Sequence, residues 1–155
     1  MGKERGAVRR RRVILGGMGA LALPGLARGQ QDPTSQEPTP MRVTFRFAEQ
    51  TLEAVLYDNA TARDFYARLP LALEIEDYST NEKIVHMPQK LIEDAGGRFD
   101  NEQPHDICYY APWGNLALYH AGYVWSRGLI RIGRFEAGGE ALTVRGTYPL
   151  RIDAV

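Results

Sequence analysis

Residues 105–120 read HDICYYAPWGNLALYH. Two short runs rich in aromatic and β-branched or apolar residues flank the segment Ala111–Asn115, whose Pro, Gly and Asn are typical of a tight turn. This pattern predicts a strand, a turn and a second strand. Four large aromatic side chains gather around the turn, namely Tyr109, Tyr110, Trp113 and Tyr119. Because side chains alternate between the faces of a strand, we expect about half of them in the core, with Tyr110 and Trp113 exposed.

Alternating apolar and polar residues predict further short strands on both sides of this segment. Residues 42–47 and 50–57 are separated by a short polar turn, which predicts an antiparallel hairpin. Three more strands are predicted at 71–78, 82–87 and 129–135. A last strand is predicted within 142–152, where Gly146 and Pro149 indicate a bulge or an edge position.

One amphipathic helix is predicted between the second and third strands. Asn59 is a suitable N-cap, and Pro70 ends the helical pattern. Apolar residues recur along one face at Ala62, Phe65, Tyr66 and Leu69. A single helix in a strand-rich chain is expected to cap an open end of a barrel. Residues 88–106 are predicted to form a long loop, with a short helical possibility at 89–95.

Residues 1–29 have the order of regions found in a secretory signal. Four arginines, Arg9 to Arg12, precede an apolar run of 11 residues and a small-residue cleavage pattern ending at Gly29. The apolar run is shorter than the roughly 20 residues that span a bilayer, so no stable membrane span is predicted. Arg10 and Arg11 with the following apolar pair resemble a twin-arginine signal, and an ordinary Sec signal is the alternative. We therefore expect a periplasmic or secreted protein after cleavage near Gly29.

Residues 30–41 contain three prolines and few apolar side chains, which predicts a disordered linker before a folded domain at 42–155. Without the signal, which holds seven basic residues and one acidic residue, the chain has 12 basic and 18 acidic residues. A net charge of about −6 gives no basic surface for nucleic acid or anionic lipid. Those partners are excluded.

The sequence holds no recognisable metal, cofactor or nucleophile motif. Cys108 is the single cysteine, so no intramolecular disulfide can form, and we expect its side chain to be buried. His105, Cys108 and His120 lack the spacing of a metal site. The glycine pairs lack the Lys-Ser/Thr of a phosphate loop, and Ser126 lacks a nucleophile elbow.

Several motifs in residues 42–155 resemble those of the small bacterial cyclophilin-like domains. They are Leu69-Pro70 at the helix end, Glu76-Asp77-Tyr78 at a strand end, the corner from Tyr109 to Ala117, and the later segments 126–130 and 132–134. The resemblance implies a mainly β fold: a closed or nearly closed cyclophilin-like β-barrel with one amphipathic helix capping an end.

The resemblance does not extend to the motif of the prolyl isomerases. Those enzymes carry an arginine before a Pro-Gly-Phe segment and a later Gln-Gly-Gly, whereas residues 83–89 lack both the arginine and the double glycine. We therefore expect a binding module for a small molecule or an extended peptide, without a cofactor. Its predicted pocket lies at the barrel mouth and is formed by Tyr78, His86, Tyr110, Trp113 and Arg127.

Two enzymatic alternatives stay open at this point. In a diverged prolyl isomerase, Arg127 would donate to the prolyl nitrogen while Tyr110 and Trp113 supply an apolar wall. In the second alternative, the domain assists a flavodoxin-like redox protein, as similar domains do in some bacterial chains. The sequence leaves the oligomeric state open.

Overall fold

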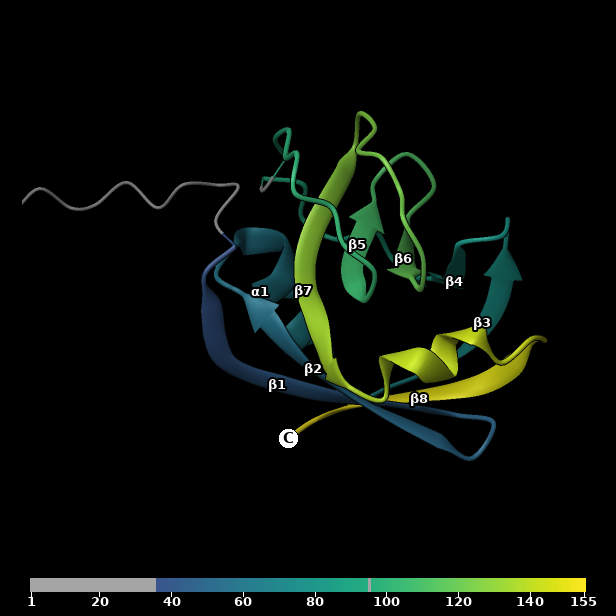
Figure 1. The fold of residues 1–155 in the computed structure, drawn as a ribbon. Helices are drawn as coiled ribbons and strands as arrows, with labels where there is room; N and C mark the ends of the chain where they lie inside the picture. The colour runs from purple at the N-terminus through teal and green to yellow at the C-terminus, as the bar shows by residue number, and fades with distance from the viewer. Residues whose placement is uncertain (1–35, 95) are drawn as a thin grey trace, which may run out of the picture.

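The computed structural model describes residues 36–94 and 96–155, which form a closed antiparallel barrel of eight strands (Figure 1). This confirms the predicted fold class. The strands are β1 (Pro38–Phe47), β2 (Gln50–Tyr57), β3 (Leu71–Tyr78), β4 (Glu82–His86), β5 (Asp106–Tyr110), β6 (Asn115–Tyr119), β7 (Leu129–Ala137) and β8 (Tyr148–Ala154). The helix α1 (Ala60–Ala67) and the 3-10 helix η1 (Gly139–Thr143) complete it. The predicted export signal and the first part of the predicted linker lie outside the described residues.

The strand order around the barrel is β1-β2-β7-β5-β6-β4-β3-β8, and β8 pairs with β1 to close it. The predicted hairpin between β1 and β2 is confirmed, with Phe45 opposite Leu52. Two neighbour relations join segments far apart in the chain: β7 lies between β2 and β5, and β4 pairs with β6 across the long loop. These two pairings decide which outward side chains meet.

Strand alternation divides the side chains into an inner and an outer set. Tyr109 and its neighbours at alternate positions of β5 and β6 are buried in the barrel core. Phe45 lies at the centre of that core, with its ring 5.1 Å from Phe135 in an edge contact and 6.4 Å from Phe65. Cys108 and Tyr119 belong instead to a second, smaller cluster on the outer face of β5 and β6. The barrel therefore has a filled interior and a separate apolar layer outside it.

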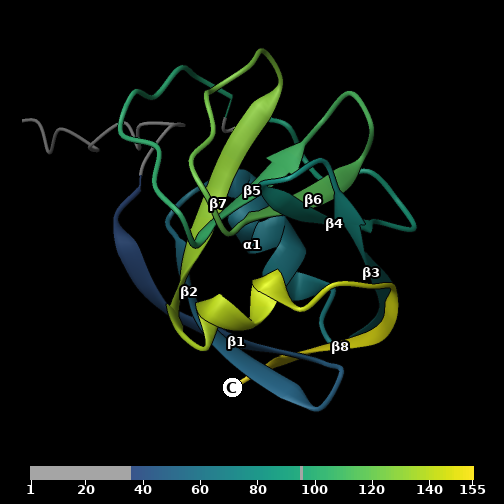
Figure 2. The same cartoon turned by 45° about the vertical axis from the view of Figure 1, so that its right-hand side comes forward.

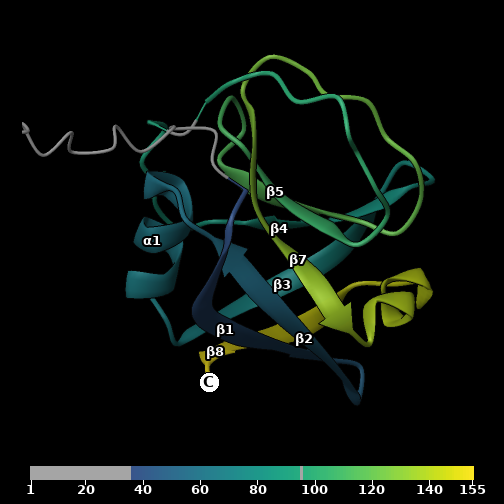
Figure 3. The same cartoon turned by 60° about the vertical axis from the view of Figure 1, so that its left-hand side comes forward.

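Helices cover both ends of the barrel. Figure 2 looks along the barrel with η1 in front and α1 behind, and Figure 3 shows them on opposite sides. The predicted N-cap is confirmed, because the Asn59 side chain accepts a hydrogen bond from the Ala62 N–H at 2.8 Å. Phe65 of α1 and Leu142 of η1 are fully buried in the core. Because both ends are covered in this way, the barrel mouth is not where this domain offers its aromatic pocket.

The N-terminal strand and the long loop differ from their predictions. β1 begins at Pro38, not at residue 42, because Thr39 donates a hydrogen bond to the Leu56 carbonyl and extends the pairing past an irregularity. Residues 89–94 form no helix. Their backbone groups are satisfied by other parts of the chain: the Leu91 N–H donates to the Tyr109 hydroxyl at 3.1 Å, and the Ile92 N–H donates to Asp64 at 2.8 Å.

The prediction of a bulge or an edge position for the last strand is wrong for β8 as a whole. β8 pairs with β3 and β1 without a register shift. Pro149 is tolerated because it pairs only with Glu74 of β3, whereas pairing with β1 starts at Arg151. Gly146 lies before the strand, and its N–H donates to Asp77 at 2.7 Å.

Candidate functional site

The aromatic corner joins β5 to β6 and holds Trp113 away from the core. The N–H groups of Trp113 and Gly114 both donate to the Tyr110 carbonyl, at 3.2 and 2.9 Å. Gly114 has a φ of +70°, a left-handed conformation that glycine adopts without strain. Gly128 supports the corner from behind: its carbonyl accepts the Ala111 N–H at 2.9 Å, and its backbone passes close to the Pro112 ring.

The four aromatic residues of the corner divide as predicted. Tyr109 and Tyr119 are buried, whereas Trp113 is 53 % exposed and Tyr110 is partly exposed. Strand alternation separates Tyr109, which points into the barrel, from Tyr110, which points outward. Tyr119 also points outward, and it is buried because the Tyr123 ring stacks on it. The outward set forms part of a surface pocket.

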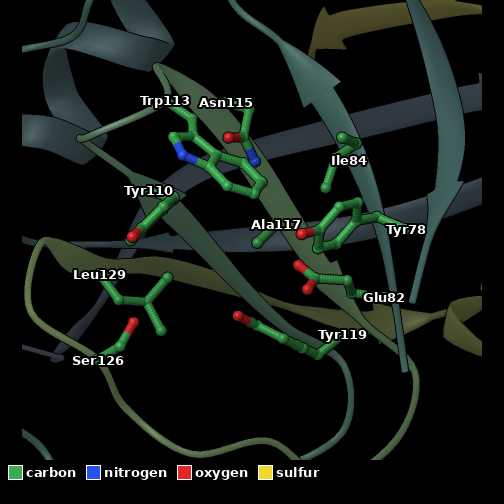
Figure 4. Close-up of a pocket in the computed structure, with 10 residues that line it drawn as sticks. All are labelled: Tyr78, Glu82, Ile84, Tyr110, Trp113, Asn115, Ala117, Tyr119, Ser126 and Leu129. Atoms are coloured by element: carbon green, nitrogen blue, oxygen red, sulfur yellow. The ribbon is translucent and has the colours of Figure 1, made fainter. Parts of the chain in front are cut away.

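A pocket of about 200 Å³ lies on the outer face of the barrel beside this corner (Figure 4). Outward residues of β3, β4, β5 and β6 line it, together with the corner and the loop before β7. The lining residues are Tyr78, Glu82, Ile84, Tyr110, Trp113, Asn115, Ala117, Tyr119, Ser126 and Leu129. Ile84 and Ala117 are partners on β4 and β6, so the floor of the pocket is apolar.

Three aromatic rings form one wall of the pocket. The Trp113 ring makes edge-to-face contacts with Tyr78 and with Tyr110, each with centroids 5.4 Å apart and interplanar angles of 88° and 77°. Edge-to-face pairs of this kind are favourable because the positive edge of one ring meets the negative face of another. The contacts hold the exposed Trp113 ring in place without burying it.

Glu82 is the one acidic residue of the pocket lining. It starts β4 opposite Tyr119, and Figure 4 shows its carboxylate between the Tyr78 and Tyr119 rings. In residues 36–94 and 96–155, no side chain donates a hydrogen bond to this carboxylate and no cation pairs with it. Burial therefore raises the pKa of Glu82 from 4.5 to about 7. Burial also raises the pKa of Tyr119, and the nearby Glu82 charge raises it further.

Asn115 adds a second acceptor that is without a partner. Its side chain is 2 % exposed, and its amide N–H donates to the Leu116 carbonyl at 2.9 Å. This leaves the side-chain oxygen of Asn115 without a hydrogen bond from any described residue. A buried acceptor in this condition is uncommon in folded proteins.

The structure brings together three of the five residues predicted for the site. Tyr78, Tyr110 and Trp113 line the pocket, but on the outer face and not at the barrel mouth. His86 follows Ile84 on the outward side of β4 and lies beyond the lining, with its Nε2 3.5 Å from Glu76. Arg127 borders a separate depression, on which Lys90 and Glu93 also lie.

The other lining residues were missed because they meet through a long-range pairing. Asn115, Ala117 and Tyr119 alternate along β6, and Glu82 and Ile84 alternate along β4. The alternation is visible in the sequence. The partnership of β4 with β6 across the long loop is not, so nothing in the sequence placed Glu82 beside the aromatic corner.

In a second polar region on the same outer face, the carboxylate of Asp106 has several partners. Asp106 is 1 % exposed and accepts hydrogen bonds from Arg131, Arg134, the Tyr123 hydroxyl and the Gln103 N–H, at 2.7, 3.1, 2.8 and 2.9 Å. Burial alone would lower the pKa of Arg131, but its hydrogen bond to Asp106 raises that pKa. The Tyr123 ring stacks on Tyr119 with centroids 3.6 Å apart, which connects this network to the pocket.

The remaining candidate residues do not form a reactive site. Cys108 is fully buried, as predicted, and burial raises the pKa of its thiol. Across the residues that the structure describes, no three His, Cys, Asp or Glu side chains converge as metal ligands would. The same residues include no helix with the length and apolar character to cross a membrane.

Comparisons with known proteins address the family and the fold. A family model described as the cyclophilin-like family matches residues 45–153. The solution structure of a hypothetical protein from Archaeoglobus fulgidus is similar, with a TM-score of 0.57, 16 % identity and coverage of 77 % of this chain and 98 % of that chain. No curated protein matches. The structural likeness supports the fold alone, and the family model spans most of the chain, so this protein belongs to the cyclophilin-like family.

Proposed function

We propose that this domain is a binding module, and that the outer-face pocket takes a small molecule or one side chain of an extended peptide. The observation that carries this proposal is the pocket of about 200 Å³ with its aromatic wall, apolar floor and unpaired acceptors. Concave sites with apolar walls and a few convergent polar groups are the usual form of ligand sites. An exposed tryptophan and a buried acceptor without a hydrogen bond have no benefit for stability alone.

The enzymatic alternatives receive less support. A prolyl isomerase needs a donor to the prolyl nitrogen, and the lining contains no arginine, because Arg127 borders a different depression. The buried Cys108 thiol, with its raised pKa, is a poor nucleophile. Because this thiol is buried, a redox partner cannot reach it. A proline-peptide isomerisation assay on the full chain should show the uncatalysed rate, and a clearly faster rate would favour the isomerase.

The binding proposal is tested by following Trp113 during a ligand screen. The chain has two tryptophans, so the indole N–H signal of Trp113 can be assigned in a nitrogen–proton spectrum by comparison with Trp113→Phe. Proline peptides, small acids and flavins are added to the full chain. We expect at least one class to shift the Trp113 signal and to leave Trp125 unchanged.

A second variant tests the same pocket by filling it and keeps the three aromatic rings of its wall. Ala117 is on the floor, and Ala117→Leu places a larger apolar side chain into the open space. Binding should be lost while the melting temperature is kept. If no class shifts Trp113, or if Ala117→Leu binds as well as the parent, the outer-face pocket is not the site.

We also propose that residues 1–29 direct export and that the mature domain works in the periplasm or outside the cell. The order of arginines, apolar run and small residues in the sequence supports this proposal. In a bacterial host, the exported form should lack about the first 29 residues by mass. Replacement of both Arg10 and Arg11 by lysine should stop export by the twin-arginine route, whereas undiminished export would indicate the Sec route.

A further inference from the structure

The charges around the pocket all have one sign. Glu82 is the only carboxylate of the lining, and the lining holds no lysine, arginine or histidine. Lys83 is next in sequence, but it is 0 % exposed, points into the barrel and pairs with Asp77 at 2.7 Å. The Lys83 ammonium group is therefore paired with Asp77 inside the barrel and does not face the pocket. The pocket therefore presents a carboxylate without a compensating cation.

Other aromatic sites of this molecule carry a cation from the chain itself. Lys83 lies 5.6 Å from the Phe47 ring centroid, Arg98 lies 5.7 Å from Trp125, and Arg131 lies 4.3 Å from Phe99. The Tyr78, Tyr110 and Trp113 cluster has no such partner among residues 36–94 and 96–155. Aromatic faces are electron-rich and attract cations, tryptophan most strongly.

We infer that the outer-face pocket binds an organic cation, an amine or alkylated ammonium group, against the Trp113 ring and the Glu82 carboxylate. This inference rests on the proposed function and names its ligand class. A pocket of about 200 Å³ is smaller than sites for drug-sized ligands, so it fits a head group or the end of one side chain. The charge of the cation would supply the partner that Glu82 lacks.

The shape of the pocket agrees with a compact charged group. The Trp113 ring, with Tyr78 and Tyr110 each in edge-to-face contact with it, encloses one side, and Figure 4 shows the Glu82 carboxylate on the opposite side of Ala117 from Trp113. The buried side-chain oxygen of Asn115 lies beside Trp113 in Figure 4 and adds the negative end of a dipole. An anionic ligand would meet repulsion from the Glu82 carboxylate and from the Asn115 oxygen, whereas a cation is attracted by both and by the faces of the aromatic rings.

The test compares two probes of the same shape and different charge. Choline is titrated into the full chain, and 3,3-dimethyl-1-butanol, in which carbon replaces the charged nitrogen, is titrated in parallel. The Trp113 indole N–H signal reports occupancy, and affinities come from its shift. We expect choline to bind about tenfold tighter than the neutral alcohol.

Charge-removing variants show whether Glu82 provides this preference. In Glu82→Gln the shape is kept, and the ratio of the two affinities should fall towards one. Glu74→Gln removes an exposed carboxylate of β3 outside the lining and should leave the ratio unchanged. Melting temperatures of both variants confirm that the fold is intact.

The outcomes separate this inference from the proposed function. Equal binding of both probes, lost in Ala117→Leu, would overturn the cation inference and keep the binding module. If neither probe shifts Trp113, the cation inference is wrong, and the wider screen alone decides the proposed function. Peptides with free or trimethylated lysine in parallel titrations distinguish a protein side chain from a free small molecule as the source of the cation.

Discussion

Asp106 and Glu82 are two carboxylates on the outer face of the same barrel, and their surroundings are opposite. Asp106 is almost fully buried and accepts four hydrogen bonds, two of them from arginines. Glu82 lies in an aromatic pocket without a donor or a cation among the described residues. In the first arrangement the carboxylate has its partners, and these hydrogen bonds fix loops to the sheet. The second is incomplete, which is the condition expected of a group that awaits a ligand.

The two carboxylates are nevertheless connected. The Tyr123 hydroxyl donates to Asp106, while the Tyr123 ring stacks on Tyr119, which lines the pocket beside Glu82. The hydrogen bonds of Asp106 therefore help to hold Tyr119, a residue of the pocket lining, in position. Mutations should separate the two roles, since damage to Asp106 should affect stability first and damage to Glu82 should affect binding first.

The largest effect is expected for Asp106→Ala. This change leaves the nearly buried Arg131 without its ion-pair partner, so the free energy of unfolding should fall by about 3–5 kcal/mol. Urea unfolding of the full chain measures the loss. The exposed pair between Arg46 and Asp153 provides the control, because Asp153→Ala should cost about 1 kcal/mol or less. Equal losses in the two variants would show that the Asp106 network is not a stabilising element.

A smaller loss is expected for Gly128→Ala, which disturbs the support of the aromatic corner. Gly128 has a φ of +90°, and a Cβ atom there would lie 2.7 Å from the Pro112 side chain. We expect a loss of about 1–3 kcal/mol, together with a changed Trp113 signal. Gly122→Ala is the matched control, since a Cβ atom at that position meets nothing within 4 Å. A stable Gly128→Ala with an unchanged Trp113 signal would contradict this account of the corner.

Trp113→Ala should have little effect on stability. The ring is 53 % exposed, so we expect a loss of about 1 kcal/mol or less, compared with about 3–5 kcal/mol for a buried ring such as that of Phe45. Urea unfolding of Trp113→Ala and Phe45→Ala compares the two positions directly. A loss in Trp113→Ala as large as that in Phe45→Ala would place Trp113 in the core and remove it from the proposed site.

The effect expected for Glu82 depends on pH. Its pKa in the folded chain is about 7, above the ordinary 4.5, so the folded state holds this proton more tightly than the unfolded state does. Glu82 therefore favours folding most below pH 4.5, and this contribution falls as the pH rises to about 7 and is constant above it. In Glu82→Gln this pH dependence of stability is absent, because the amide does not titrate.

The measurement is the difference in unfolding free energy between Glu82→Gln and the parent chain. This difference should move in favour of the variant between pH 4.5 and about 7. Glu74→Gln, which changes an exposed carboxylate, should show no such movement. A pH-independent difference for Glu82→Gln would mean that its carboxylate is well solvated and that the pocket does not bury it.

Local sequence patterns predict most of the elements of this fold. The alternation of β1 and β2, the Asn59 N-cap and the turn at Gly114 depend on neighbours within a few residues, so each is readable from the chain. The same local reasoning separates Tyr109 from Tyr110. It fails in the long loop, where Leu91 and Ile92 bond to distant side chains and no helix forms.

The candidate site is harder to predict because it depends on pairings between distant strands. Tyr78, Tyr110 and Trp113 are recognisable as outward aromatic residues. Glu82 lies opposite Tyr78 in the short β3–β4 hairpin, but it reaches Tyr110 and Trp113 only because β4 pairs with β6. His86 and Arg127 have suitable chemistry but lie outside the pocket. His86 is at the end of β4, and Arg127 precedes Gly128, whose backbone lies close to Pro112. No local sequence pattern predicts these positions.

Closure of the barrel limits how this domain can hold a peptide. In the described part of the chain, every strand has hydrogen-bonded neighbours on both sides, since β8 returns to β1. An extended peptide therefore finds no strand with a wholly free edge to join, which is the mode in which main-chain bonds supply affinity. We expect recognition to depend on a single inserted side chain or head group. Specificity would then reside in outward residues that can be exchanged without disturbing the core.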